Sequence, residues 1–342
     1  MSATMRDVAA RASVSVATVS RTLAGSESVA QEVQERVRAA ADELGYFGSR
    51  LPANLRAKNV RILALVVGNV RNAYFPELID GCTKAARLAG FPLIFGDSNE
   101  DAERESEILE ELALERVSGV ALASASGSTP GLGRLLDLGI PVVAVDRRLP
   151  GLPVDTVTVA SELGAYEAMR HLLGLGHQRI GLMGGPMHMS TMVEREAGYR
   201  RALKDAGLAV DPSLIVHGDL QENTARALVP QLMGLARPPT AVLTINDLST
   251  IGTLRGFRDL GLRIPDDISI IGFDDVIGAD LFDPPLTVIT QPVFDIGQRA
   301  IELLVRRAAI PEAPLEEVVL EARLMLRGST APARSRESLE EV

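Results

Sequence analysis

Residues 62–95 read ILALVVGNVRNAYFPELIDGCTKAARLAGFPLIF, and this stretch decides the fold of most of the chain. Its β-branched apolar start, 62–67, predicts a strand, and Pro76 and Gly90 can begin and end a helix between them. A second apolar run over 91–95 predicts the next strand. Strands that are separated by a helix of about 10–15 residues pair in parallel, so the stretch predicts a βαβ unit.

The same alternation continues outward from this stretch to about residue 307. A helix, a glycine and a strand follow one another again around Gly139, Gly176 and Gly261. Because so many units exceed one open sheet, we predict two doubly wound parallel-sheet subdomains with a ligand cleft between them. Further strands are expected at 117–123, 140–145, 180–183, 214–216, 241–245 and 268–271, and further helices at 103–114, 132–138, 162–173, 195–206, 224–235, 248–260 and 296–307.

The first 47 residues predict three short helices that form a small all-α head. Thr4 can cap the first helix together with Asp7, and Ser15 can cap a second helix that ends near Leu23. A third helix is expected over 31–44, where a glycine follows. Helices of this size bury little apolar surface, so we expect the head to be attached to a larger body.

A linker over 48–60 and a polar tail over 331–342 flank the body at 61–330. Residues 50–57 of the linker can form a helix of about two turns, which is too short to be stable alone in water. We therefore expect this segment to fold only against a partner. The tail is expected to be frayed.

Composition places the chain among globular α/β proteins. It has 342 residues, of which 46% are hydrophobic and 23% charged. The longest apolar run, 62–67, is far shorter than the about 20 residues that cross a bilayer, and the first residues lack the apolar stretch of a secretory signal. We expect no membrane partner and a cytoplasmic location. The single cysteine, Cys82, excludes an internal disulfide and is expected to be buried.

Charge divides unevenly along the chain. Residues 1–60 carry 8 Lys and Arg against 6 Asp and Glu, whereas the rest brings the total to a net charge of −10. A basic head on an acidic body favours contact of the head with phosphates and limits nonspecific contact of the body.

Motifs of the common enzyme classes are missing from the sequence. It contains no phosphate-binding G-x-x-x-x-G-K-[ST] loop, no G-x-S-x-G turn and no complete dinucleotide fingerprint. The four histidines do not form H-E-x-x-H or another metal-binding pair. We therefore predict no catalytic residue, no cofactor and no metal site. The acidic runs at 101–111 and 316–317 are interpreted as solvated faces.

Polar side chains follow several of the predicted strands. In open α/β sheets, ligands bind at the carboxyl ends of the strands, so these residues are candidates for a binding site. The alternative for each acid is that it caps the next helix. Arg195 opens a predicted helix and offers a guanidinium suited to hydroxyls or a carboxylate. The strand-end candidates are Asp97, Ser124, Asp146, Arg147, Asn246, Asp247, Asp274 and Asp275.

The order and spacing of many short motifs resemble the lactose-repressor/galactose-repressor (LacI/GalR) family of bacterial transcription regulators. The resemblance covers about residues 4–331 and therefore both the head and the body. The motifs are TMRDVA at 4–9, VSVATVSRTL at 14–23, NAYF at 72–75, DRR at 146–148, LGHQRIG at 175–181, REAGY at 195–199, ND at 246–247, IGFDD at 271–275, TQP at 290–292 and LRGST at 326–330.

The resemblance implies a homodimer that binds a pseudo-palindromic double-stranded DNA operator. The recognition helices would enter adjacent major grooves, and the linker helix would press Leu55 into the minor groove. With no apolar heptads after Thr330, no tetramer is expected. The implied DNA-binding residues are Thr4, Ser15, Val16, Ala17, Thr18, Ser20, Arg21, Asn54 and Leu55.

For the body, the resemblance implies a periplasmic-binding-protein-like fold. The chain would cross between subdomains near 160, 290 and 320, so that one subdomain comprises about 61–160 and 290–320 and the other about 161–289 and 321–330. The implied effector-binding residues are Asn72, Tyr74, Phe75, Asp97, Ser124, Asp146, Arg147, Thr191, Arg195, Asn246, Asp247, Asp274 and Gln291. Departures from the family pattern are Ser13, Ala24, Gly48, Pro52-Ala53 and Ala160-Ser161.

These features predict a transcriptional repressor whose operator affinity is controlled by a small molecule. We favour a carbohydrate, because carboxylates, amides and a guanidinium suit hydroxyl groups, with Phe75 as an aromatic face. The alternative is a nucleoside or purine, but the chain has no Trp, and Arg147 and Leu220 stand where purine-binding members of the family have aromatic residues. A solute-binding transport component and an α/β enzyme are further alternatives, which the head and the missing motifs disfavour.

Overall fold

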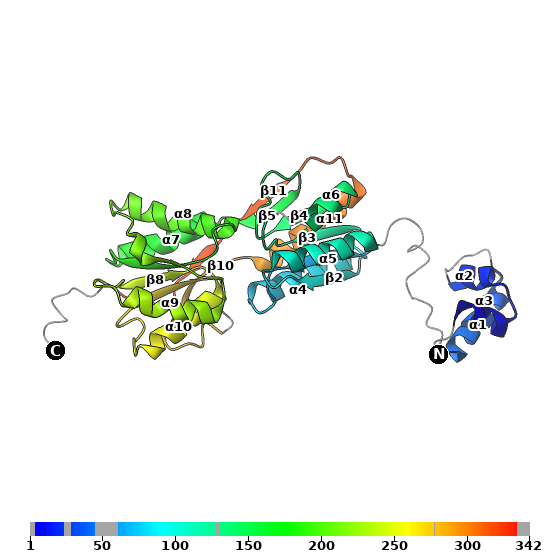
Figure 1. Ribbon diagram of the computed structural model, residues 1–342, viewed down its shortest axis with the longest axis horizontal. Helices are drawn as coiled ribbons and strands as arrows, with labels where there is room; N and C mark the ends of the chain where they lie inside the picture. The colour runs from blue at the N-terminus through cyan, green and yellow to red at the C-terminus, as the bar shows by residue number, and fades with distance from the viewer. Residues whose placement is uncertain (1–3, 24–28, 45–60, 128–129, 277, 334–342) are drawn as a thin grey trace.

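The computed structural model describes residues 4–23, 29–44, 61–127, 130–276 and 278–333. The described residues form a small helical unit and a body of two α/β subdomains (Figure 1). Within these ranges, no helix has the length and apolar character needed to cross a membrane.

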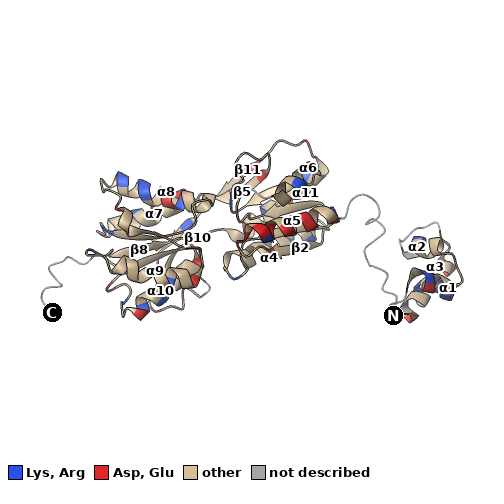
Figure 2. Cartoon of the chain, in the orientation of Figure 1, with Lys and Arg blue, Asp and Glu red and all other residues tan. Residues whose placement is uncertain are grey.

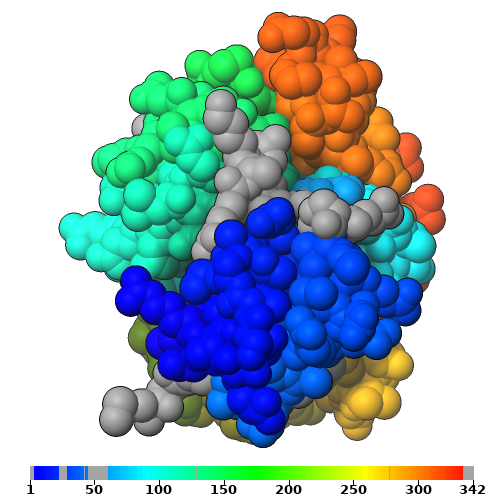
Figure 3. All heavy atoms as spheres, turned by 90° about the vertical axis from the view of Figure 1, so that its right-hand side faces the viewer, coloured from blue at the N-terminus to red at the C-terminus, as the bar shows by residue number. Residues whose placement is uncertain are grey.

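The helical unit consists of α1 (Met5–Ala12), α2 (Val16–Leu23) and α3 (Gln31–Glu43). Both predicted caps are confirmed: Thr4 and Asp7 form a reciprocal capping box, and the Ser15 hydroxyl accepts a hydrogen bond of 3.1 Å from the Thr18 N–H. The three helices share one small core, which gives the unit the rounded surface in blue in Figure 3. The core consists of Val8, Ala9, Ala12, Val19, Val37, Ala40 and Ala41.

The first subdomain contains a six-stranded, all-parallel sheet in the order β11-β5-β4-β3-β1-β2. Alternate residues of β1 face opposite sides of the sheet. Leu63 and Leu65 pack against α4 (Tyr74–Leu88) and α11 (Val293–Ala309) on one side. Val66 packs against α5 (Ala102–Glu115) and α6 (Pro130–Asp137) on the other. The strands are β1 (Leu63–Val67), β2 (Leu93–Asp97), β3 (Gly119–Leu122), β4 (Val142–Val145), β5 (Asp155–Val159) and β11 (Glu317–Leu320).

The second subdomain repeats this architecture in a sheet of order β12-β10-β9-β8-β6-β7. Helices α7 (Ser161–Gly174) and α8 (Ser190–Asp205) cover one face, and α9 (Glu222–Met233) and α10 (Asp247–Asp259) the other. A short 3-10 helix spans Pro212–Leu214. The strands are β6 (Ile180–Gly184), β7 (Ile215–His217), β8 (Ala241–Thr244), β9 (Ser269–Phe273), β10 (Thr287–Thr290) and β12 (Arg323–Met325).

Three short segments connect the subdomains, because β5, β10 and β11 are each followed by an element of the other subdomain. The predicted class of two doubly wound subdomains is confirmed, with one difference: β12 pairs antiparallel to β10. The chain leaves the second subdomain through β10 and re-enters it through β12, so these two neighbouring strands run in opposite directions. Acidic residues are prominent on α5 and basic residues on α8 (Figure 2).

Local hydrogen bonds place the end of α4 and the start of β2 differently from the prediction. The Phe91 N–H donates to the Ala86 carbonyl and ends α4, and Pro92 has no N–H to donate, so β2 begins at Leu93 rather than at 91. Cys82 is buried where α4 meets α11, as predicted, and burial raises the pKa of its thiol to about 12. The helices approach so closely there that a Cβ at Gly81 would lie 2.2 Å from the Phe294 carbonyl oxygen.

Candidate functional site

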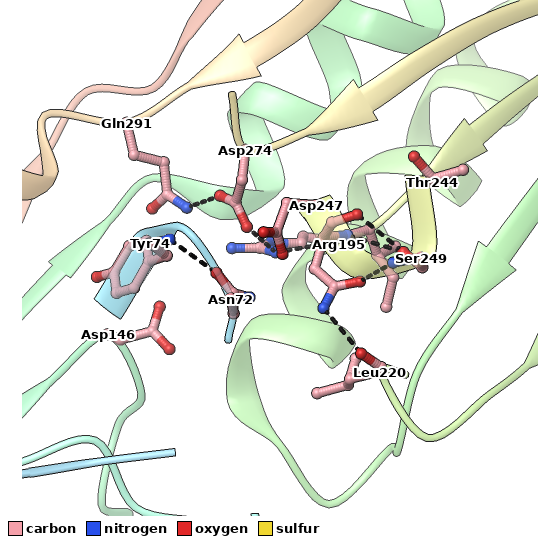
Figure 4. A network of polar contacts seen from close by, with 12 residues as sticks. Asn72, Tyr74, Asp146, Arg195, Leu220, Thr244, Asp247, Ser249, Asp274 and Gln291 are labelled. Atoms are coloured by element: carbon pink, nitrogen blue, oxygen red, sulfur yellow. Dashed lines mark hydrogen bonds and ion pairs between the residues drawn. The ribbon is translucent and has the colours of Figure 1, made fainter. Parts of the chain in front are cut away.

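Two aspartates occupy equivalent positions in the two subdomains. Asp146 follows β4 and donates its N–H to Val157 of β5 over 3.1 Å, and Asp274 follows β9 and donates to Ile289 of β10 over 2.9 Å. Both have left-handed backbones, with φ of 65° and 71°. Such strain in residues with a side chain is typical of functional sites. The matching geometry brings both carboxylates to the contact between the subdomains (Figure 4).

Arg195 reaches the same place from α8. Its side chain is only 3% exposed, and Nη1 donates to the carbonyl of Ile245. Nη1 also lies 3.9 Å from Oδ2 of Asp274, and the guanidinium carbon lies 3.6 Å from the centre of the Phe273 ring. Stacking and hydrogen bonding therefore hold the guanidinium in one orientation.

We call these three side chains, together with the polar side chains around them, the polar cluster. Gln291 donates from Nε2 to Asp274, and the Asn72 side-chain oxygen accepts the Tyr74 N–H over 2.8 Å (Figure 4). The Tyr74 hydroxyl is buried near Asp146 without a hydrogen bond of standard geometry. The cluster consists of Asn72, Tyr74, Asp146, Arg195, Asn246, Asp247, Asp274 and Gln291.

Buried polar atoms without a hydrogen-bond partner gather at this cluster. In the described part of the chain, seven side-chain nitrogen or oxygen atoms are in this state. Three belong to Tyr74, Arg195 and Gln291. A fourth, Nε of the neighbouring Arg147, has no hydrogen bond of standard geometry but lies 3.3 Å from Oδ2 of Asp146. Since such atoms are costly when left unpaired, their concentration indicates a site that a polar ligand completes.

Burial controls the acid–base properties of the cluster. It raises the pKa of Asp146 and Asp247, and it raises the pKa of Asp274 to about 7 against the opposing effect of Arg195. Burial and the nearby Asp146 and Asp274 raise the pKa of Tyr74 far above its ordinary value. Protonated carboxyl groups can donate hydrogen bonds as well as accept them, which suits hydroxyl-bearing ligands.

Asp274→Asn is expected to remove one pH dependence of stability. Because the pKa rises from 3.8 to about 7, folded Asp274 holds a proton at pH values where the unfolded chain does not. The contribution of Asp274 therefore favours folding below about pH 4 and is lost as the pH rises to about 7, with a slope of at most about 1.4 kcal/mol per pH unit. Urea unfolding of both proteins between about pH 5 and pH 8 measures the difference.

Asp137→Asn, on the exposed side of α6, is the matched control and should retain the wild-type slope. An unchanged slope in the Asp274 variant would show that another group titrates.

Two predicted residues link the subdomains or cap a helix. Asp247 accepts the Ala73 N–H of the first subdomain over 2.8 Å, so it holds the two halves together. Asn246 caps α10 in a reciprocal box with Ser249, which is the alternative considered for strand-end residues. Beside them lies a cavity of about 370 Å³ lined by Arg71, Gln221, Glu222, Asn223, Leu248 and Arg255.

Other predicted residues have partners outside the cluster. Asp97 accepts the Asn99 N–H in its own turn. The Ser124 hydroxyl donates to Glu105, and the Phe75 ring lies in the core under the first sheet, edge-on to the Tyr74 ring. Arg147 is paired with Glu100, and its Nε also lies 3.3 Å from Oδ2 of Asp146 in the cluster. Thr191 is buried at the start of α8.

The sequence interpretation missed two acids beside the cluster, Glu100 and Glu105. Residues 101–111 were interpreted as a solvated face, and this is wrong for Glu105, which is fully buried and accepts from Ser124 and the Ala125 N–H. Glu100 lies in a loop after β2, and no motif marks it. Both acids are recruited by residues distant in sequence, so no local signal could have identified them.

A larger cavity, of about 550 Å³, lies at the amino ends of β3, β4 and β5 in the first sheet. Val117, Leu138 and Ile140 are among its apolar walls, and Asp155 and Arg307 pair with each other within it over 2.8 Å. None of the seven unpaired buried atoms of the described residues lines this cavity. The polar cluster is therefore the better candidate for the effector site.

The second helix of the head presents a surface suited to DNA. Val16 is 43% exposed, and Ala17 and Arg21 also face outward, away from the core side of Val19. The helix carries no acidic residue. Thr4, Ser15 and Thr18 take part in caps, and Ser20 is half-buried. The predicted contacts Asn54 and Leu55, with the whole linker, lie outside the described residues.

A helix-turn-helix unit joined to two ligand-binding subdomains is the architecture of a DNA-binding regulator. Comparison with known families agrees with this. The pattern of bacterial regulatory proteins of the lacI family matches residues 4–49, and that of the periplasmic binding protein-like domain matches residues 169–330.

Two curated relatives span nearly the whole chain. The HTH-type transcriptional repressor PurR of Vibrio atlanticus is 34% identical over 307 residues, which cover 89% of this chain and 92% of the relative. The HTH-type transcriptional repressor CytR of Escherichia coli K12 is 33% identical over 329 residues, or 96% of each chain. The chain therefore belongs to the LacI family of DNA-binding transcriptional repressors.

Solved structures show the same architecture. The transcriptional regulator CelR in complex with cellobiose superposes with a TM-score of 0.74 at 31% identity, and covers 96% of this chain and 99% of its own. A LacI-family regulator of Enterococcus faecium with bound ribose has a TM-score of 0.73 at 30% identity, and covers 80% and 100%.

Proposed function

We propose that this protein is a repressor whose affinity for its operator is controlled by a small carbohydrate bound in the polar cluster. One observation carries the proposal: unpaired buried polar atoms of both subdomains converge there. A ligand that contacts both sets favours one closure of the subdomains, and only such differential contact can shift the balance between DNA-binding and non-binding forms. The protein acts by binding, with no catalytic step.

The chemistry of the cluster favours a sugar. Asp146, Asp274 and Gln291 offer oxygen acceptors and Arg195 offers donors, which together match adjacent hydroxyl groups. A purine would gain from flat aromatic walls, but the chain has no Trp, and the loop before α9 presents Leu220 to the cluster (Figure 4). Two similar regulators have cellobiose and ribose bound.

A thermal-shift screen of sugars, sugar phosphates and nucleosides tests the effector class. A ligand present at 100 times its Kd stabilises the folded protein by about 2.7 kcal/mol. We expect a sugar to raise the unfolding temperature and to change operator binding in a gel-shift assay. Stabilisation by a nucleoside alone would transfer the proposal to that class.

We further propose a homodimer. β2 is an edge strand that exposes Ile94 and Phe95, the latter by 58%, and Leu88 at the end of α4 is 75% exposed. In the second subdomain, Leu281 is 84% exposed beside Phe282. Exposed apolar edges of this kind are usually covered by a partner, and two copies related by a two-fold axis would read a pseudo-palindromic operator. Residues 1–47 would serve as the DNA-binding domain, 48–60 as the hinge and 61–330 as the effector and dimerisation body, in the bacterial cytoplasm where the operator lies.

Arg21→Ala is expected to weaken operator binding by about 1–3 kcal/mol, because a bidentate base contact would be lost. The side chain is exposed, and its Nε donates to the Ala17 carbonyl of its own helix over 3.3 Å. A gel-shift titration on a duplex selected from random DNA measures the change.

The control is Arg38→Ala, which removes an exposed arginine from α3. It should reduce binding far less and equally on all sequences. Equal losses for both variants would remove Arg21 from the base-reading surface.

A further inference from the structure

Arg147 stands beside the polar cluster with its charge already neutralised. Its Nη1 and Nη2 donate to the two carboxylate oxygens of Glu100 over 2.6 and 2.7 Å, and Nη1 also donates to the Ser124 carbonyl over 2.9 Å. Nε of Arg147 lies 3.3 Å from Oδ2 of Asp146. Burial lowers the pKa of Arg147, and Glu100, Asp146 and Glu105 together more than reverse this effect, so the pKa lies above its ordinary value. The face of the guanidinium that would grip a ligand anion is therefore occupied by the protein.

The backbone around Glu100 is strained in a way that places this carboxylate. Asn99 and Glu100 both have left-handed backbones, with φ of 52° and 59°. The Glu100 N–H donates to the Gly68 carbonyl over 2.6 Å, and a Cβ on Gly68 would lie 2.3 Å from Glu100 Oε1. A side chain at position 68 would therefore displace the Glu100 carboxylate from Arg147, whereas glycine leaves it in place.

Acidic groups outnumber basic groups around the site. Glu100, Glu105 and Asp146 surround Arg147 in the first subdomain. In the second, Arg195 pairs with Asp274, and Asp247 lies close enough to Asp274 to raise its pKa. These five carboxyl groups and the two guanidinium groups of Arg147 and Arg195 are buried or nearly buried. The adjoining cavity adds Arg71, which is exposed at its outer side, and Arg255, which is paired with Glu222 over 2.5 Å. The buried interior therefore carries an excess of carboxylates.

We propose that Glu100 is a specificity-determining residue that makes this site reject anionic effectors. By neutralising Arg147, it leaves a ligand phosphate or carboxylate facing buried acids with a single guanidinium, and like charges at short range in a poorly solvated interior repel strongly. Hydroxyl groups can donate to the same carboxylates. The effector is therefore the uncharged sugar and not its phosphate ester, a statement that rests on the proposed function.

Inorganic phosphate is the first probe, because it tests the charge argument without a known effector. At pH 8, above the pKa of about 7 of Asp274, phosphate at a few millimolar, compared with chloride at equal ionic strength, should leave the unfolding temperature of the wild type unchanged. Glu100→Ala vacates the carboxylate position in front of Arg147, so phosphate should stabilise this variant by several degrees and give a measurable Kd in calorimetry.

Glu162→Ala is the matched control. It frees Arg201, a surface arginine that Glu162 otherwise contacts over 2.6 Å, and it should show no phosphate effect. Should the Glu100→Ala protein fail to fold, Gly68→Ala displaces the same carboxylate without removing it and should gain phosphate binding. Phosphate stabilisation of the wild type, or none in either folded variant, would overturn the proposal.

Paired ligands form the second arm. The pair is chosen by the thermal-shift screen: ribose against ribose 5-phosphate for a sugar, or adenosine against its 5′-monophosphate for a nucleoside. The wild type should bind the uncharged member at least about tenfold more tightly than its phosphate ester. Glu100→Gln should narrow that preference by a similar factor. Wild-type affinity for an ester equal to that for its uncharged partner would contradict the role of Glu100. If no small molecule alters operator binding, the proposed function fails, and the phosphate measurements alone then decide the role of Glu100.

Discussion

Replacement of Phe95 by aspartate is expected to convert the protein to a monomer and to weaken operator binding by about 10²- to 10⁴-fold. Phe95 lies on the edge strand β2 and is 58% exposed, next to the exposed Ile94. In the proposed dimer, the aspartates of the two subunits would face each other across the two-fold axis, buried and unpaired, and would repel each other. Two linked heads bind adjacent half-sites with a high effective concentration, and a monomer loses that advantage.

Sedimentation velocity gives the mass, and a gel-shift titration gives the affinity for operator and for a single half-site. Leu114→Asp is the control, since Leu114 is an exposed apolar residue near the end of α5 and not on the edge strand. It should remain dimeric with wild-type affinity. A dimeric Phe95→Asp protein would move the interface elsewhere, and half-site affinity should in any case stay unchanged.

Arg195→Ala is expected to abolish the response to the effector. The guanidinium is buried, stacked on Phe273 and adjacent to Asp274, so a ligand bound there would lose its donors and leave buried carboxylates uncompensated. Truncating one member of a buried charged pair costs about 2–5 kcal/mol of binding, which is a loss of about thirtyfold or more. Operator affinity without effector should stay near that of the wild type.

Calorimetry with the sugar found in the screen, together with a gel shift at rising sugar concentration, tests this expectation. Arg195→Lys is the informative comparison, because it keeps the charge and loses the planar fork. The lysine variant should regain stability relative to Arg195→Ala, but it should regain little of the affinity for the effector. Undiminished binding by Arg195→Ala would show that the side chain is structural and that the effector binds elsewhere.

The contacts between the subdomains show how effector binding could reach the head. Besides the bond from Ala73 to Asp247, the Arg148 N–H donates to the Ser190 hydroxyl over 2.9 Å, and Nε of Arg148 donates to Glu194 over 3.0 Å. These bonds join the subdomains on the effector side. We expect a ligand that alters them to change the relative position of the subdomains, and the linker 48–60 joins the first subdomain to the head in the sequence.

Local features of the sequence predicted the elements well. Thr4 with Asp7 and Ser15 with Thr18 form the expected caps, because a cap depends on residues three positions apart. The strands at 62–67 and 117–123 were predicted within a few residues, because a buried parallel strand is an apolar run. The start of β2 was predicted two residues too early, since the bond that ends α4 involves Phe91.

The candidate site was predicted only in part. Asp146, Arg195 and Asp274 were identified, and the structure brings them together, because carboxyl ends of parallel strands share one edge. Ser124 and Arg147 were identified by the same rule but engage Glu105 and Glu100 instead. Which strand-end residue turns to a ligand and which to a neighbour depends on side chains far apart in the sequence.

The sequence by itself determined the order of elements, the small helical head, the two α/β subdomains and the family, because periodicity, caps and motif spacing are local properties. Tertiary structure alone decided that β12 runs antiparallel, that Glu105 is buried and that Glu100 neutralises Arg147. The last of these depends on the left-handed backbone at Asn99 and Glu100 and on the missing side chain at Gly68. Such contacts join residues 32 and 47 positions apart from Glu100, and no local pattern records which of many acids the folded chain brings to one arginine.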